Sequence, residues 1–187
     1  MPDVFSLEPR TPINRNDSFI LSYRHILKYF SGLKKISDDD LDRGAHMVYG
    51  WMPTILHLHP AEPCISLKGG AEILTKAKSE TLTRDEIAYL KCLINNSVVG
   101  TSKLLHFVAP NHYAIWDSKV CSFVHGFNNR RRANNVERYL EYLELLKSLM
   151  KDSRFKSFHA VVNKECGYHV SALRALELRM FLNAPHQ

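Results

Sequence analysis

VVGTSKLLHFVAPNHYAIWDSKVCSFV, residues 98–124, is the stretch that decides the fold. Gly100 stands between two apolar runs with helical spacing, one ending at Ile94 and one beginning at Leu104, so it predicts the bend between two helices. A third helix is expected to begin at Asp117, after a loop over 110–116. Lys103 therefore follows the predicted bend closely, and Asp117 stands fourteen positions later.

The order of helix, glycine turn, lysine, helix, aromatic loop, aspartate and helix resembles the core of the helix-hairpin-helix DNA glycosylase superfamily. The closest stretch is NHYAIWDSKV, residues 111–120. Members usually carry Leu-Pro-Gly-x-Gly at the hairpin and a longer lysine-to-aspartate spacing, whereas residues 97–100 here keep a single glycine and no proline. The resemblance implies an all-α, multi-helix fold, with the hairpin and the aspartate at the mouth of a cleft between two helical lobes.

The resemblance also implies roles for individual residues. Asp117 would be the catalytic carboxylate, and Lys103 stands where the lyase-competent branch carries its nucleophilic lysine. Gly100, Thr101 and Ser102 would hold a DNA phosphate through the hairpin backbone. Simpler interpretations exist for each: Asp117 as a helix N-cap, Lys103 as a phosphate-contacting or solvated lysine, and Gly100 as a helix C-cap. We expect activated water as the nucleophile and a phosphate contact for Lys103.

Four aromatic residues are candidates to line a pocket for an extruded base: Tyr49, Trp51, Tyr113 and Trp116. Large aromatic side chains are also common in protein cores, so each has that alternative. Histidine is plentiful as well, but His57-x-His59 has no further ligand at a recognisable spacing, which argues against a metal site.

Length and composition set outer limits. A chain of 187 residues with 45% apolar content can bury one core, or two interleaved helical lobes. We expect a single all-α domain over 1–187, with the hairpin and the aspartate at about 83–126. No run of 18 apolar residues occurs, and the segment MPDVFSLEPR has no signal-peptide core, so we expect a cytoplasmic protein without membrane contact. We also expect it to be a monomer.

The cysteines are scattered at positions 64, 92, 121 and 166, with no CxxC pair. This spacing argues against a zinc ribbon, a disulfide scaffold and the four-cysteine iron-sulfur cluster of some glycosylases. We therefore expect neither a metal nor another cofactor.

The net charge of +6 and the isoelectric point near 9.2 favour a polyanionic partner. Three adjacent arginines, Arg130, Arg131 and Arg132, follow Asn128 and Asn129 in a predicted loop. Because adjacent guanidinium groups repel one another unless an anion faces them, we expect this triplet to contact double-stranded DNA.

Helical periodicity dominates the remaining sequence, and no segment shows a clear strand alternation. Thr83 and Glu86 form a predicted capping box, and Ser37 with the acidic residues that follow it opens another helix. PAEPCISLKGG, residues 60–70, is predicted as a loop. The other expected helices cover about 17–31, 135–151, 154–164 and 170–182.

These observations predict a DNA N-glycosylase that flips a damaged or modified base from the duplex and hydrolyses its glycosidic bond with the help of Asp117. The alternative is a non-catalytic, all-α module that binds DNA or another protein. The alternative predicts that Asp117 caps its own helix and faces no cavity, whereas the enzyme needs Asp117 and Lys103 in one cleft. The sequence leaves open which base is removed, and whether the role is repair or defence against foreign DNA.

Overall fold

The computed structural model describes residues 1–10, 12–52, 54–59, 65–126 and 130–185, with the side chains of Arg130 and Arg131 left out. The protein is all-α, as predicted: in the described ranges no strand forms, and an isolated bridge joins Leu58 to Ile94. A short 3-10 helix, η1, covers Val4–Ser6. The α-helices are α1 (Ser18–Gly32), α2 (Asp38–Trp51), α3 (Leu67–Ala77), α4 (Arg84–Leu93), α5 (Val98–Val108), α6 (Ser118–His125), α7 (Arg130–Ala133), α8 (Val136–Leu149), α9 (Phe155–Cys166) and α10 (Ala172–Leu182).

Side-chain caps fix where many helices begin. The predicted box at α4 is confirmed, because Thr83 Oγ1 accepts from the Glu86 backbone N–H and the Glu86 carboxylate accepts from the Thr83 N–H. Ser37 and Asp40 form the same reciprocal pair at α2. Such caps satisfy backbone donors that the first helical turn leaves unpaired, so they are local signals that a sequence reveals.

The predicted position of the hairpin bend is wrong. The chain reverses at Asn95 and Asn96, which have φ angles of 53° and 46°, and Gly100 lies inside the first turn of α5. Asparagine tolerates the left-handed region better than most residues. Gly100 instead permits a close approach, because a Cβ there would lie 2.0 Å from the hydroxyl oxygen of Tyr49. The glycine is required by packing rather than by a turn.

The expected loop over 60–70 is also shorter than predicted. Residues 60–64 lie outside the described residues, and α3 already begins at Leu67, where Ser66 Oγ accepts from the Gly69 N–H at 3.0 Å. Gly70 lets α3 pack closely on α4, since a Cβ there would meet the Leu93 side chain at 2.5 Å. A Cβ at Gly69 would likewise lie 2.3 Å from the Tyr89 hydroxyl oxygen, so both glycines serve helix packing.

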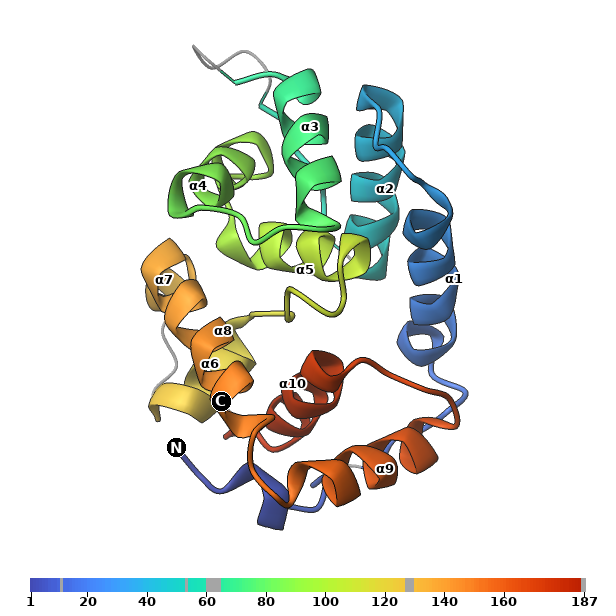
Figure 1. Ribbon diagram of the computed structural model, residues 1–187, viewed down its shortest axis with the longest axis vertical. Helices are drawn as coiled ribbons and strands as arrows, with labels where there is room; N and C mark the ends of the chain where they lie inside the picture. The colour runs from blue at the N-terminus through green and yellow to red at the C-terminus, as the bar shows by residue number, and fades with distance from the viewer. Residues whose placement is uncertain (11, 53, 60–64, 127–129, 186–187) are drawn as a thin grey trace.

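The helices form two groups, and the packing of α8 on α4 connects them (Figure 1). In the upper group α2, α3 and α4 pack around α5, while in the lower group α6 and α9 pack on α10. The helix α1 contacts both α2 and α5. One continuous cluster of buried side chains extends from Val4 to Met180, so the two groups share a hydrophobic core.

Candidate active site

A cavity of about 190 Å³ lies where α2 ends, α6 begins, and α5 and α10 face each other. It is lined by two basic and two acidic side chains and by five apolar ones. These lining residues are Phe19, Trp51, Met52, Lys103, Ile115, Asp117, Arg174, Glu177 and Phe181. The cavity therefore contains both residues that the sequence singled out for chemistry, Lys103 and Asp117.

Lys103 projects from α5 into this cavity and is partly buried. Its Nζ lies 6.0 Å from the centroid of the Trp51 ring, within the range of a cation-π contact. Burial lowers the pKa of Lys103 below its usual value, and the nearby negative charges of Asp117 and Glu177 oppose that shift. A lysine in this environment reaches the neutral, nucleophilic form more readily than an exposed lysine.

Asp117 has two roles in the structure. Its Oδ1 accepts a hydrogen bond of 2.9 Å from the Val120 N–H, so the carboxylate is the N-cap of α6. The same side chain lines the cavity beside Lys103. Because a carboxylate has two oxygens, the capping bond leaves acceptor capacity for a second partner.

The loop before Asp117 is held by hydrogen bonds to three helices, which explains how residues fourteen positions apart meet. Ser102 Oγ accepts from the Trp116 N–H and donates to the Trp116 carbonyl, both at 3.0 Å. The Trp116 indole donates to the Ala133 carbonyl at 2.8 Å, and the Tyr139 hydroxyl donates to the Ala114 carbonyl at 3.0 Å. Since Ser102 precedes Lys103 and Trp116 precedes Asp117, this pairing places the two functional candidates side by side.

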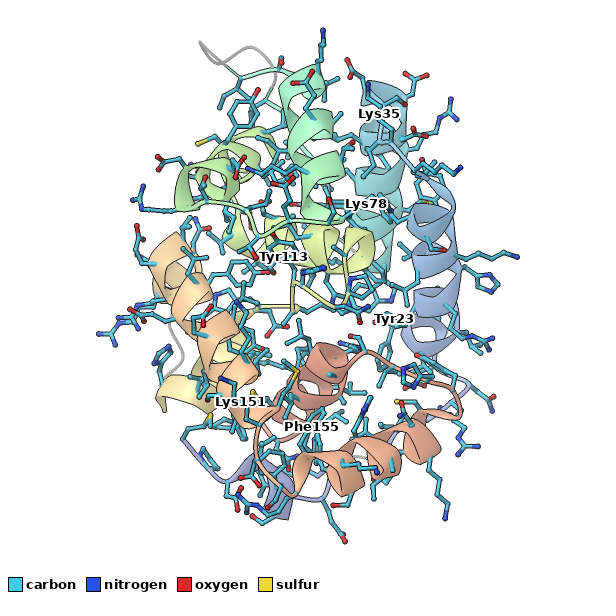
Figure 2. The ribbon with its side chains drawn as sticks, in the orientation of Figure 1. Tyr23, Lys35, Lys78, Tyr113, Lys151 and Phe155 are labelled. Carbon is cyan, nitrogen blue, oxygen red and sulfur yellow. The ribbon has the colours of Figure 1, made fainter. Side chains whose placement is uncertain are left out.

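His106 supplies a further restraint from the interior of α5. Its Nδ1 is 2.8 Å from the Tyr113 carbonyl oxygen and its Nε2 is 2.7 Å from the Tyr23 hydroxyl. The carbonyl can only accept, so Nδ1 carries the proton and Nε2 accepts from Tyr23. Burial and, to a smaller extent, the charge of Arg174 lower the pKa of His106 to about 3, so the ring is neutral. Figure 2 shows Tyr23 and Tyr113 near the middle of the molecule.

Arg174 and Glu177 are functional candidates that the sequence interpretation missed. Both lie on α10, at 4% and 1% exposure, and Arg174 Nη1 donates to Glu177 Oε2. The guanidinium carbon of Arg174 also lies 5.0 Å from the centroid of the Tyr23 ring. Two opposite charges three residues apart in the apolar segment ALRALEL were the available signal, because charged residues are almost never fully buried unless paired.

Burial raises the pKa of Glu177 to about 7, and the negative charge of Asp117 adds to that shift while Arg174 opposes it. The cavity thus brings together one amine with a lowered pKa, one carboxyl with a raised pKa and the capping carboxylate of Asp117. Groups whose pKa values are moved toward neutrality by burial are common where protons are transferred.

Only part of the predicted aromatic set lines the cavity. Trp51 does, and its indole N–H is fixed by a 2.9 Å hydrogen bond to the Phe19 carbonyl. Tyr49, Tyr113 and Trp116 are core residues with at most 3% exposure and are absent from the lining. Phe19 and Phe181 provide aromatic surface instead.

The predicted phosphate contacts at the hairpin are not accessible. Thr101 and Ser102 are fully buried, and the Gly100 N–H donates to Ser97 Oγ at 3.1 Å. These groups serve the first turn and the interior of α5, because the bend lies at Asn95 and Asn96 and not at Gly100.

The arginine triplet begins the short helix α7 rather than forming a loop throughout. Arg132 is exposed, whereas the side chains of Arg130 and Arg131, together with residues 127–129, lie outside what the structure describes. Their contact with DNA stays a prediction.

Within the described ranges, no three histidine, cysteine or carboxylate side chains stand close enough together to hold a metal ion. None of the helices described there is long and apolar enough to cross a membrane. Comparison with known proteins found no matching family model, no matching curated protein and no matching solved structure.

Proposed function

We propose that the protein is a DNA N-glycosylase that acts on a damaged or modified base. The observation that supports this function is the meeting of Lys103, Asp117 and the aromatic ring of Trp51 in one cavity. The alternative of a non-catalytic module predicts an Asp117 that faces no cavity, whereas this Asp117 both caps α6 and lines the cavity. The geometry therefore favours an enzyme over a purely structural cap.

The cavity size limits what can enter. A volume of about 190 Å³ is below that of ordinary ligand pockets, which are roughly 300–1,000 Å³. It suits one flat ring system better than an entire nucleotide. A base in duplex DNA reaches such a site only after its nucleotide has been rotated out of the stack. Trp51, Phe19 and Phe181 would contact the faces and edges of the extruded ring.

In the proposed reaction, the bond between C1′ and the base nitrogen breaks, and its electron pair leaves with the base. Asp117 would stabilise the positive charge that develops at C1′, because a fixed carboxylate in a desolvated site acts strongly on such charge. A new bond to C1′ would form either from a water oxygen or from Lys103 Nζ, and the nucleophile would pass one proton to the Asp117 carboxylate. The departing base takes up one proton, which Glu177, with its raised pKa, would donate.

The position of Lys103 bears on the choice of nucleophile. A lysine that only contacts the DNA backbone would be expected on the surface of the hairpin, but this lysine lies partly buried over Trp51. Its lowered pKa also suits an attacking amine. These features support covalent attack by Lys103 as the first route to test, with activated water as the alternative.

The first experiment replaces Asp117 with asparagine, which is also a good helix N-cap. Base release should fall by at least about 100-fold, while the thermal midpoint changes little, because the charge is removed and the capping oxygen is kept. The measurement is mass detection of free base after incubation with duplexes that carry oxidised, alkylated or phage-type modified bases. Asp85→Asn is the matched control, since Asp85 is an exposed carboxylate in the first turn of α4.

Near-normal base release by Asp117→Asn would reject the proposed chemistry and leave Asp117 as a cap. Absence of base release by the unaltered protein across the whole panel would reject the glycosylase function itself.

The second experiment traps the covalent intermediate with borohydride. If Lys103 attacks C1′, a protein-DNA adduct forms, and Lys103→Met removes the adduct. Lys119→Met is the matched control, because Lys119 is an exposed lysine close to the cavity, with its Nζ 4.5 Å from the centroid of the Phe181 ring. Base release without any adduct would instead assign the nucleophile to water.

A further inference from the structure

A second hollow surface lies on the outer side of α1, where it meets the turn between α9 and α10. The hollow has a volume of about 630 Å³, and Arg15, Arg24, His25 and Lys28 line it together with Tyr168. An adjoining hollow of about 490 Å³ shares Arg24, Lys28 and Tyr168. We call this continuous surface the α1 groove. None of the described residues that line either hollow is acidic.

The positive charge of the α1 groove is not neutralised within the described part of the protein. Arg24, His25 and Lys28 are exposed, and no ion pair joins any of them to a described carboxylate. The sequence of α1, SFILSYRHILKYFSG, contains no aspartate or glutamate. Some exposed cations elsewhere do have acidic partners, as Arg84 has in Glu137. The groove is thus suited to an external anion with several charges.

Arg15 is placed differently from Arg24 and Lys28. Its guanidinium donates to the carbonyl oxygens of Lys164 and Glu165 at the end of α9. It therefore fixes one end of the groove, and Arg24 and Lys28, one helical turn apart, provide the charge that is free to meet a ligand.

Tyr168 indicates which part of a nucleic acid the groove would contact. One neighbour of its ring is Tyr23, stacked at 6.2 Å between centroids, and another is Arg24, whose guanidinium carbon lies 5.4 Å from the centroid. These two neighbours already use the ring for internal contacts, and the ring holds the Arg24 side chain in position. The geometry favours contacts with phosphates over stacking with unpaired bases.

We propose that the α1 groove binds the phosphate backbone of duplex DNA. The helix is 15 residues long, which corresponds to about 22 Å, and duplex DNA carries one negative charge per about 1.7 Å of its axis. Several phosphates can therefore face the groove at once. The same helix provides Phe19 to the cavity, so a duplex held along α1 would stand in a fixed position relative to the candidate active site. The choice of DNA as the polyanion rests on the proposed function, whereas the anionic character of the ligand does not.

The test combines Arg24→Gln and Lys28→Gln in a protein that also carries Asp117→Asn, so that binding is measured without turnover. Affinity for an undamaged duplex is measured by fluorescence anisotropy between about 50 and 200 mM salt. We expect at least a tenfold loss of affinity at the lower salt, and a slope of log affinity against log salt that is reduced by about 2, one for each lost phosphate contact.

The matched control changes Lys68 and Lys151 to glutamine in the same Asp117→Asn background. Both are exposed lysines outside the α1 groove and the cavity, and the change in net charge is identical. The proposal predicts a much smaller effect on affinity and slope. Equal losses in the two variants would overturn it, because net charge alone would then explain binding. An unchanged salt slope after the groove substitutions would overturn it as well.

The outcome is separable from that of the glycosylase proposal. If the groove substitutions weaken duplex binding but the unaltered protein releases no base, the groove assignment stands and the glycosylase function fails. If base is released and the groove variant binds normally, the groove assignment alone fails. The proposal would also be contradicted if the groove substitutions reduced affinity for single-stranded DNA more than affinity for the duplex. That result would indicate recognition of unpaired strands.

Discussion

The cavity and the α1 groove place charged side chains in opposite environments. In the cavity Arg174 and Glu177 are almost fully buried, each the partner of the other, and burial raises the pKa of Glu177 to about 7. In the α1 groove Arg24 and Lys28 are exposed and have no described acidic partner. The first arrangement changes the protonation behaviour of single groups. The second leaves several positive charges available to act together on a ligand.

This difference follows from the cost of removing charge from water. A buried charge needs a partner, because desolvation costs several kcal/mol per ion, whereas an exposed charge is stabilised by solvent and screened by salt. The cavity should therefore control stability and proton transfer, and the groove should control affinity with little effect on stability.

The largest effect is expected when the buried pair is broken. Glu177→Ala leaves the Arg174 guanidinium buried without its carboxylate, and Arg174 cannot lose its proton, so unfolding free energy should fall by about 3–5 kcal/mol. Urea denaturation at neutral pH measures this change. Glu137→Ala, which breaks the exposed pair with Arg84, is the control and should cost far less. Similar losses in the two variants would remove the contrast between buried and exposed charge.

The second prediction concerns pH. The folded-state pKa of Glu177, about 7, lies above its ordinary value of 4.5. Between these two pH values, Glu177 therefore keeps a proton in the folded protein and has lost it in the unfolded chain. Stability from this group is present below pH 4.5 and is lost as the pH rises through 7. The loss is at most about 3 kcal/mol over the window, with a slope below about 1.4 kcal/mol per pH unit.

Glu177→Gln removes this titration while keeping an oxygen that accepts from Arg174. The stability difference between the unaltered protein and the variant, measured by urea denaturation across pH 4.5 to 7, should therefore fall as the pH rises. The difference is used because His106 also changes the free energy of unfolding with pH. Its pKa is lowered to about 3, so its contribution to stability increases as the pH rises toward 6.5, whereas the contribution of Glu177 decreases. A difference that is constant with pH would show that Glu177 does not titrate in this range.

A smaller effect is expected at Tyr23, a neutral polar group beside the cavity. Tyr23→Phe removes the hydroxyl that donates to His106 Nε2 and leaves that buried nitrogen without a donor, at a cost of about 1–3 kcal/mol. Tyr29→Phe is the matched control on the same helix, since the Tyr29 hydroxyl bonds at 3.2 Å to the Asp40 carbonyl in a more exposed position. Chemical denaturation of both variants decides whether burial sets the size of the loss.

The smallest effect on stability is expected in the α1 groove. Arg24 and Lys28 stand four residues apart on α1, so their like charges repel each other slightly. Changing both to glutamine should leave the thermal midpoint unchanged in high salt and raise it slightly in low salt. Scanning calorimetry at two salt concentrations measures this response. A clear fall in the midpoint would mean that these cations stabilise the fold, which would weaken their assignment to ligand binding.

The sequence by itself determined the helical class and many helix starts. Periodicity indicated α1 and α8, and the pairs Ser37 with Asp40 and Thr83 with Glu86 appear as reciprocal caps in the structure. These features depend on residues within a few positions of one another, so a local pattern is sufficient to predict them. The pattern also directed attention to Lys103 and Asp117, although the chemistry assigned to them stays a prediction.

Only the tertiary structure decided how these parts are used. Gly100 resembled a bend in the sequence, but its close contact with Tyr49, 51 positions earlier in the chain, explains it better. Arg174 and Glu177 reach the cavity from the last helix, and the α1 groove is completed by Tyr168. Contacts between residues far apart in sequence leave no local periodicity or cap. They depend on how helix faces pack together, which fixes burial, charge pairing and cavity shape only once the chain has folded.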